Sequence, residues 1–282
     1  TPHPLPPVIV GVGEYAESVG PRGYAGCSPV ELAARAARAA LADTGVDVAR
    51  IADDIDIVAG IRQFELCGLA PPNPMGRSTN FPRSVAARIG ATPRRAILEI
   101  GGGQGPQHLL TEMAGALSDG DARAVLLVGS EALSTIRAAE ADLAGSRRTA
   151  ADLPDWREDP PGDLEDRGPG LEDMNSPMYA AHGLVGAIPA YALFENARRL
   201  QRGEPKAAYA REMGDLFAPF TQIAADNPLA AAPTRRTADE LVTPSERNRM
   251  VADPYTRFLV ARDQVNQGAA IVLTTVATAD RL

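Results

Sequence analysis

The residues best suited to chemistry are the glycines of Gly101-Gly102-Gly103-Gln104-Gly105, which connect an apolar stretch to a predicted helix. The first amides of a helix have no partner within the helix, and the helix dipole favours negative charge beside them. Glycine also lets a ligand approach the backbone closely. This loop could therefore hold a phosphate, a carboxylate or a developing oxyanion. The same glycines could instead serve only to let the strand and the helix pack closely.

A second glycine pattern, Gly11-Val-Gly13-Glu-Tyr-Ala16, fits the dinucleotide-binding motif G-x-G-x-x-A and follows an apolar stretch. In that motif the helix begins directly after the glycines, because its amides hold the pyrophosphate. Here the next predicted helix begins only near Ser28. A dinucleotide-binding protein of the Rossmann type therefore stays an alternative that rests on a weak motif.

The cysteines and histidines are too few and too scattered to predict a metal site or a disulfide framework. Cys27 and Cys67 are expected to be inert thiols. His108 lies one turn into a predicted helix, and we expect a buried, hydrogen-bonded histidine there, not a catalytic base. Glu99, just before the glycine loop, is expected to be a buried acid held by hydrogen bonds. No metal is predicted.

The composition argues against several classes of partner. The net charge of −8 and the pI of about 5.0 do not suit a surface that binds nucleic acid or anionic lipid. Lys206 is the only lysine, which excludes almost all lysine Schiff-base chemistry. No apolar run approaches the roughly 20 residues of a membrane span, and the first residues lack a signal-peptide pattern. We expect a cytoplasmic protein.

The elements around the glycine loop alternate between strand and helix. Helices are predicted at Ser28–Thr44, which opens with a serine cap and a proline, at Arg83–Ile89 and at about Gln107–Ser118. Short apolar runs predict five buried strands: Val8–Val12, Ile55–Ala59, Ala96–Ile100, Ala124–Val128 and Gly268–Val276. This order predicts an α/β fold, with an open parallel or mixed sheet and helices on both faces.

The pattern changes in the middle of the chain. Residues 152–173 are acidic and rich in proline and glycine, which predicts a solvated loop. Helical stretches follow at Ile188–Gln201 and Lys206–Phe217. The predicted organisation is a core of residues 1–135, an inserted, mostly helical domain of residues 136–250, and a strand of residues 251–282 that returns to the core sheet.

Four segments together resemble one family. They are VIVGVGEY at 8–15, SPVELAARAARAALADTGVD at 28–47, the stretch from AILEIGGGQGP to VLLVGSEALS at 96–134, and the closing segment from NRMVADPYTRF to QGAAIVL at 248–273. In this order they resemble the N-terminal half of a thiolase-superfamily protein. The nearest branches are the sterol-carrier-protein-x thiolases and bacterial thiolase-like proteins described as acetyl-CoA acetyltransferase. The resemblance implies a thiolase-like fold with a mixed five-stranded sheet and an inserted helical loop domain.

The resemblance also implies where the active site lies. In that family a cysteine starts the central helix in a C-x-x-G setting, and the helix leads to a G-x-E segment. Counting back from Gly129-Ser130-Glu131 places the nucleophile position at Gly103, give or take one residue. Glycine cannot form a thioester. The implied site is therefore a degenerate one at Gly103 and Gly105, where backbone amides could stabilise an oxyanion.

Other implied site residues lie in the inserted domain. His182 falls in a segment that resembles the loop domain covering the acyl-CoA tunnel, and it either lines that tunnel or is bonded locally. Arg235 and Arg236 are weak candidates for the 3′-phosphate of coenzyme A, because adjacent arginines suit phosphate. The implied ligand is a coenzyme A thioester, and no permanently bound cofactor is expected.

The resemblance covers only a first half, because thiolases consist of two similar halves. We expect a second half in the same chain, on a partner subunit or in a copy of this chain. The helix at about Gln107–Ser118 is apolar over most of its circumference, and such a helix is expected to be buried all round. The expected function is acyl-CoA binding with non-covalent C–C bond chemistry in lipid or steroid metabolism. The alternative is a pseudoenzyme that binds acyl-CoA or a partner without chemistry.

Overall fold

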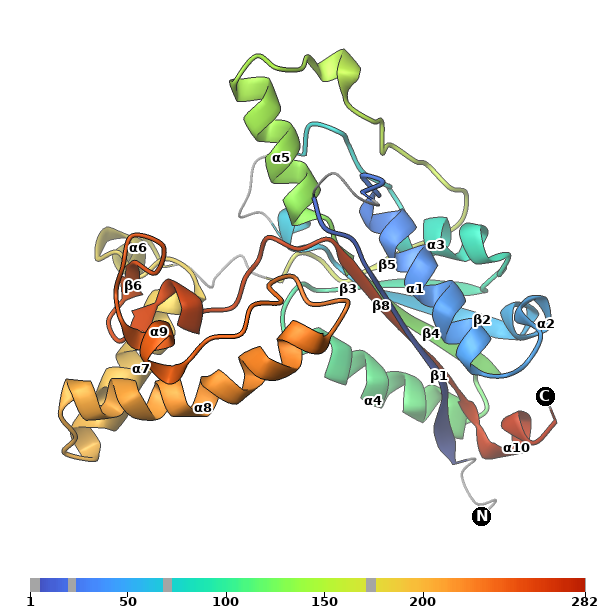
Figure 1. Ribbon diagram of the computed structural model, residues 1–282. Helices are drawn as coiled ribbons and strands as arrows, with labels where there is room; N and C mark the ends of the chain where they lie inside the picture. Colours follow the sequence, from blue (N-terminus) through green and yellow to red (C-terminus); the bar gives the residue numbers. More distant parts are fainter. Residues whose placement is uncertain (1–5, 20–23, 68–72, 171–175, 282) are drawn as a thin grey trace. The chain divides into compact units, whose positions relative to one another are not determined.

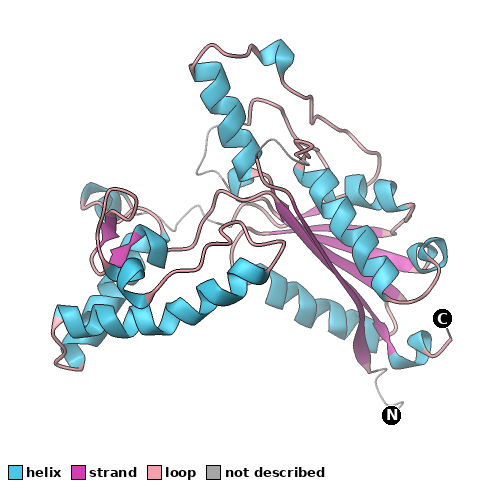
Figure 2. Ribbon diagram, viewed as in Figure 1, coloured by secondary structure: helices cyan, strands magenta, loops and turns pink. Residues whose placement is uncertain are grey.

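The computed structural model describes residues 6–19, 24–67, 73–170 and 176–281. The chain divides into two compact units, which are treated separately (Figures 1 and 2). The core unit comprises Thr1–Glu172 and Gln264–Leu282, and the inserted unit comprises Asp173–Asp263. No helix among the described residues is both long and apolar enough to cross a membrane.

The core unit is built on one mixed sheet of six strands. In spatial order the strands are β1 (Pro7–Ala16), β8 (Gln267–Thr275), β4 (Ala124–Glu131), β2 (Ile55–Ile61), β3 (Arg95–Glu99) and β5 (Glu165–Asp166). Strand β8 is antiparallel to both of its neighbours, whereas β4, β2, β3 and β5 are parallel. All five predicted strands are present. The α/β class and the mixed sheet expected from the sequence are therefore confirmed.

The sheet has one strand more than the five that were expected. The sixth, β5, has two residues and no apolar run. Charged pairs attach it instead: Arg95 donates to Glu165 at 2.7 Å and 2.8 Å, and Arg62 pairs with Asp166. Apolar runs in the sequence do not reveal an edge strand that is held by polar contacts.

Helix α1 (Pro29–Asp43) lies directly on strand β1. It begins as predicted, since Ser28 Oγ accepts the Glu31 N–H at 3.1 Å. A Cβ atom added at Gly13 would lie 2.3 Å from the Ala36 carbonyl oxygen, and one at Gly11 would meet the Ala40 oxygen at 2.1 Å. Both glycines therefore lie inside a strand and let the helix backbone approach. They form no phosphate-binding turn, so the Rossmann alternative is wrong.

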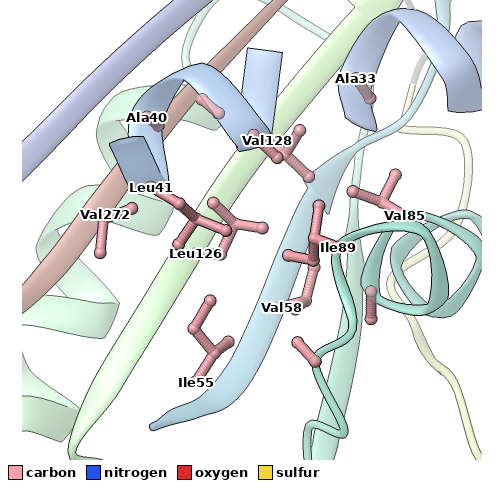
Figure 3. Close-up of a cluster of buried hydrophobic side chains, with 14 of the residues drawn as sticks. Ala33, Ala40, Leu41, Ile55, Val58, Val85, Ile89, Leu126, Val128 and Val272 are labelled. Atoms are coloured by element: carbon pink, nitrogen blue, oxygen red, sulfur yellow. The ribbon is translucent and has the colours of Figure 1, made fainter. Parts of the chain in front are cut away.

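The two faces of the sheet are covered unequally. On one face α1, α2 (Val48–Asp53) and α3 (Phe81–Ile89) enclose a large apolar cluster, in which Leu41, Val58 and Leu126 meet (Figure 3). On the other face a smaller cluster packs under α4 (Gly105–Ser118).

Helix α4 is buried along one face only in this chain. Its buried residues follow a four-residue spacing: Gly105, Leu109, Met113 and Leu117. Gln107, His108 and Thr111 are exposed. The expectation of burial all round is therefore not met within this chain, because polar side chains occupy the outer face.

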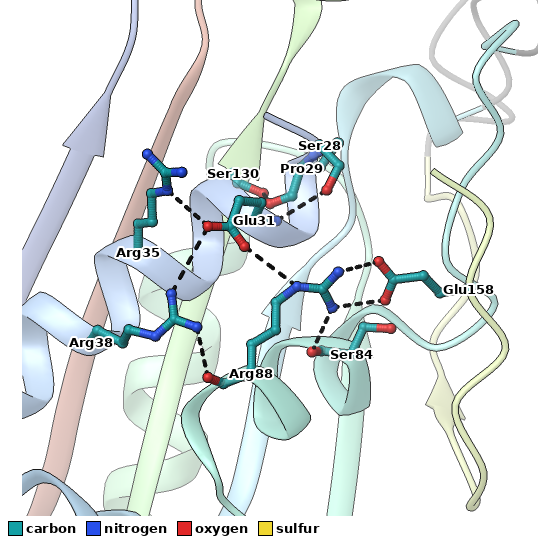
Figure 4. Close-up of polar contacts among 9 residues, drawn as sticks. All are labelled: Ser28, Pro29, Glu31, Arg35, Arg38, Ser84, Arg88, Ser130 and Glu158. Carbon is teal, nitrogen blue, oxygen red and sulfur yellow. Dashed lines mark hydrogen bonds and ion pairs between the residues drawn. The ribbon is translucent and has the colours of Figure 1, made fainter. Parts of the chain in front are cut away.

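The acidic segment after β4 packs on the core unit. Helix α5 (Leu133–Ala144) and the buried Trp156 belong to one apolar cluster. Glu158 accepts from Arg88 of α3, and Glu31 of α1 lies 3.5 Å from the same guanidinium (Figure 4). These contacts join α5 and the segment around Trp156 to the core unit, beyond the expected boundary at 135. The second boundary lies at 263, against the expected 250.

The inserted unit is mostly helical, as its sequence indicated. Its elements are α6 (Pro177–Ala181), α7 (Ala187–Gln201), α8 (Lys206–Asp226), α9 (Ala238–Val242), β6 (Met250–Ala252) and β7 (Tyr255–Thr256). The Asn248 side chain connects the end of α9 to the loop that follows it. Its Nδ2 donates to three backbone carbonyls, including those of Glu240 and Leu241, at 3.0–3.1 Å. Its Oδ1 accepts the Phe258 N–H. One buried amide thus fixes the loops of this unit.

Candidate functional site

The carboxyl ends of β2, β3 and β4 meet at one edge of the core sheet. Ligands of open α/β folds bind where parallel strands end. The Arg62 N–H donates to the Glu99 carbonyl at 3.1 Å, and the Phe64 N–H donates to Glu131 Oε1 at 2.7 Å. The segments that follow the three strands are therefore in direct contact, and the glycine loop of Gly101–Gln104 is one of them.

The three consecutive glycines of this loop have different surroundings. A Cβ at Gly101 would lie 2.1 Å from Cys67 Sγ, so a side chain at this position would have to displace the thiol. Gly102 has a φ of 138°, and a Cβ there would meet the Gln104 side chain at 2.5 Å. A Cβ at Gly103 would meet nothing within 4 Å. The position to which the nucleophile was assigned is thus the open one.

Backbone amides of the loop are available to a ligand. Among the described residues the N–H groups of Gly102 and Gly103 have no hydrogen-bond partner, and no side chain caps α4. Gly105 is buried and opens the helix; its N–H donates to the Gly102 carbonyl at 3.2 Å. Free donors at a helix N-terminus favour an anion or an oxyanion. Gly103 therefore offers donors, and Gly105 sets the turn that presents them.

Glu99 and His108 flank the loop and contact each other. Glu99 is 2% exposed, as expected for a hydrogen-bonded buried acid. The His108 side chain is 57% exposed, so its expected burial is wrong. Its Nδ1 lies 3.2 Å from Glu99 Oε2. The contact between Glu99 and His108 was not predicted, because residues nine apart meet only once the strand, loop and helix are folded.

Both cysteines are buried, in keeping with the expectation of inert thiols. Burial, reinforced by Glu17, raises the pKa of the Cys27 thiol to about 11. Burial also raises the pKa of Cys67, which lies under Gly101 at 3% exposure. A thiol with a raised pKa is a poor nucleophile because little thiolate is present.

A pair of buried carboxyls beside the loop was not foreseen from the sequence. Burial, with a smaller contribution from the nearby Glu65, raises the pKa of Glu131 to about 7. Burial also raises the pKa of Glu65 itself. One oxygen of each carboxyl, Glu131 Oε2 and Glu65 Oε2, is buried without a hydrogen-bond partner among the described residues. These acids make the end of the sheet sensitive to pH.

The other predicted site residues lie in the inserted unit. His182 is exposed at the end of α6. Arg235 pairs with Asp226 at 2.8 Å, and the Arg236 guanidinium lies 3.6 Å from the centre of the Phe258 ring. The two arginines are thus engaged locally. The structure brings together Gly103 and Gly105 in the core unit, whereas His182, Arg235 and Arg236 belong to the inserted unit.

One described cluster has the spacing of metal ligands. Ligand atoms of Glu99, His108 and Glu112 lie within 4.8 Å of one another. The Arg167 guanidinium, however, donates to Glu99 at 2.5 Å and to both oxygens of Glu112 at 2.6 Å. It supplies the positive charge that the two carboxylates require. This donor set therefore fits a guanidinium better than a metal ion.

The chain was compared with known proteins. No protein-family model and no curated protein matches it. Among solved structures, a protein from Mycobacterium smegmatis described as a monomeric SCP2-thiolase-like protein type 1 matches with a TM-score of 0.73 and 40% identity. That match covers 99% of this chain and 48% of the other.

This chain has a thiolase-like fold. Two further structures share the fold at lower identity. The Ltp2–ChsH2(DUF35) aldolase has a TM-score of 0.62 and 18% identity, over 99% of this chain and 58% of that one. An acetyl-CoA acetyltransferase from Syntrophomonas wolfei has a TM-score of 0.56 and 16% identity, over 99% and 66%. The thiolase-like chain spans about half the length of the Mycobacterium smegmatis protein.

The open position in this thiolase-like loop can be tested with a thiol. We expect Gly103→Cys to fold normally, because the new Cβ meets nothing within 4 Å. Its thiol should react with iodoacetamide about tenfold faster than an ordinary exposed cysteine, since a helix N-terminus lowers a thiol pKa. Peptide mass spectrometry would give the alkylation rate at each cysteine.

The matched control for that experiment is Gly115→Cys. Gly115 is exposed in the middle of α4, and a Cβ there also meets nothing within 4 Å. It lacks the free amides of the first turn. Equal alkylation rates at positions 103 and 115 would show that the loop does not stabilise negative charge at position 103.

Proposed function

We propose that this chain is one half of a thiolase-like protein that binds acyl-CoA and acts on it without a covalent intermediate. The observation that carries the proposal is the glycine loop itself. Gly103 has no side chain to acylate, yet the amides of Gly102 and Gly103 at the start of α4 have no partner in the part of the chain that the structure describes. A thioester oxygen would be stabilised there as charge develops on it.

Identity to the Mycobacterium smegmatis protein supports the ligand class. At 40% over nearly the whole chain, the likeness extends beyond the fold. The aldolase, at 18% identity, shows only that the same fold occurs in a protein described by carbon–carbon chemistry. The likeness to the Mycobacterium smegmatis protein thus supports the proposed acyl-CoA ligand. The proposed reaction is at the carbon beside the thioester, and the proposal includes no permanently bound cofactor.

A second half belongs to the proposal. The chain spans 48% of a protein described as monomeric, which favours a second half within the same chain over a partner subunit. Val12 lies on the sheet face opposite α1, because it alternates with Gly11 and Gly13, and it is 55% exposed. A single helix, α4, covers the apolar cluster of that face. A second half would cover the remainder.

Titration calorimetry with hexanoyl-CoA tests the binding. The full-length protein should bind it more tightly than free coenzyme A. Gly103→Glu should weaken binding at least about tenfold, because its carboxylate would occupy the free amides. Gly115→Glu adds the same charge on the exposed face of α4 and should leave the affinity unchanged. Equal affinities for all three proteins would contradict a site at the loop.

Intact-mass analysis tests the absence of a covalent step. After incubation with acetoacetyl-CoA we expect no acetyl adduct, because Gly103 offers no thiol and both cysteines are buried. A stoichiometric adduct on Cys67 would overturn the non-covalent mechanism. Binding without any turnover or exchange of the ligand would instead support the non-catalytic alternative.

A further inference from the structure

The Glu99–His108 contact leaves one imidazole nitrogen free at the loop. A carboxylate oxygen can only accept a hydrogen bond, so His108 Nδ1 must carry the proton that bridges the 3.2 Å to Glu99 Oε2. In the neutral imidazole, Nε2 then holds a lone pair. It has no partner among the described residues, and the side chain is 57% exposed. Glu99 thus orients the imidazole through Nδ1, and Nε2 is left available to a ligand.

Glu99 is itself held firmly. Its Oε1 accepts the Ile100 N–H at 3.2 Å, and its Oε2 also accepts from Arg167 at 2.5 Å. Arg167 makes two further bonds of 2.6 Å to Glu112, and these lower the pKa of Glu112. A carboxylate with three donors in a buried position cannot turn freely. It therefore fixes both the tautomer and the ring orientation of His108.

The pair adjoins the free amides. Glu99 is the last residue of β3, the glycine loop follows, and His108 lies in the first turns of α4. Side chains on a helix point toward its N-terminus, which directs the imidazole toward the turn that presents Gly102 and Gly103. A base and a pair of oxyanion donors beside one another are what removal of a proton next to a carbonyl requires.

We propose that His108 is the base that removes a proton from Cα of a bound acyl thioester, and that Glu99 is its positioning residue. This rests on the proposed acyl-CoA function. The Nε2 lone pair takes the proton, the C–H electron pair forms the Cα=C bond, and the carbonyl π pair moves to oxygen. The amides of Gly102 and Gly103 stabilise the resulting enolate. Return of the proton from Nε2 restores the thioester.

The test is hydrogen exchange of hexanoyl-CoA in D2O, catalysed by the full-length protein and followed by mass spectrometry. Wild type should incorporate deuterium at Cα. His108→Ala should slow this by about 100-fold, the usual contribution of a general base. Added imidazole should restore part of the rate in His108→Ala, which loss of structure alone would not allow.

Two variants separate positioning from structure. Glu99→Gln should slow exchange about tenfold with unchanged hexanoyl-CoA affinity, and it should have no further effect when His108 is already alanine. Glu112→Gln disturbs the same Arg167 and removes a nearby charge but leaves the Glu99–His108 contact in place, so its exchange rate should fall less than that of Glu99→Gln. Equal losses in Glu99→Gln and Glu112→Gln would overturn the positioning role.

Failure of the inference is distinguishable from failure of the proposed function. If the protein binds hexanoyl-CoA but neither wild type nor His108→Ala exchanges deuterium above the buffer rate, His108 is not the base and the binding function stands. If exchange is equally fast in wild type and His108→Ala, another group removes the proton. If hexanoyl-CoA does not bind at all, the proposed function and this assignment both fall.

Discussion

Replacement of Gly13 by alanine is expected to destabilise the protein by about 3 kcal/mol or more. The added Cβ would lie 2.3 Å from both the Ala36 carbonyl oxygen and the Ala40 nitrogen. Both are backbone atoms of α1, so no side chain can rotate away and the helix itself must shift. Chemical denaturation monitored by circular dichroism would give the change in free energy of unfolding.

Gly115→Ala is the control for that measurement, because it makes the same substitution in open space. Gly115 is exposed to solvent and lies away from the ends of α4, where alanine should stabilise the helix by roughly 0.5–1 kcal/mol relative to glycine. The two substitutions therefore have opposite expected signs. A Gly13→Ala protein as stable as wild type would mean that α1 does not rest on β1, and the dinucleotide interpretation of these glycines would need to be reopened.

The strands and helices that could be predicted are those whose signal lies within their own short stretch of sequence. Strand β4 and helix α1 could be located because apolar runs and a Ser28-Pro29 cap depend on neighbours in sequence. Strand β5 could not, since its stability comes from Arg62 and Arg95, about 70 to 104 residues away. Helix α5 was missed for a similar reason: it packs on Trp156 in a segment whose composition indicates only a loop.

The candidate site divides in the same way. The loop at Gly103 was predictable because a glycine run between a strand and a helix is a local signal. Its surroundings were not. Cys67 lies under Gly101, and Arg167 bridges Glu99 to Glu112, across sequence separations of 34 to 68 residues that no spacing rule connects. His108 was expected to be a buried, hydrogen-bonded histidine one turn into its helix. Its place on the outer face depends on which face the sheet covers.

Glu131 makes the stability of the core depend on pH. Its carboxyl has a pKa of about 7 in the folded protein, against an ordinary value of 4.5, because it is buried. Between these values the folded state keeps a proton that the unfolded state has lost. The stabilising effect of that proton is complete below about pH 4.5 and is lost as the pH rises through 7. The total is roughly 3 kcal/mol, from about 1.4 kcal/mol for each pKa unit.

Glu131→Gln should therefore remove most of this pH dependence. Glutamine keeps an oxygen to accept the Phe64 N–H, which Glu131 holds at 2.7 Å, but it cannot ionise. Between pH 5 and pH 8 we expect the variant to gain about 2 to 3 kcal/mol relative to wild type, measured by denaturant unfolding at both pH values. Glu112→Gln serves as a control with the opposite expected sign. Arg167 lowers the pKa of Glu112, so this carboxylate stabilises the fold at pH 5 and at pH 8. The variant should therefore be less stable than wild type, and the loss should be about the same at the two pH values. A Glu131→Gln protein with the wild-type pH profile would show that the carboxyl is ionised and solvated, and that the end of the sheet beside the glycine loop is open to water.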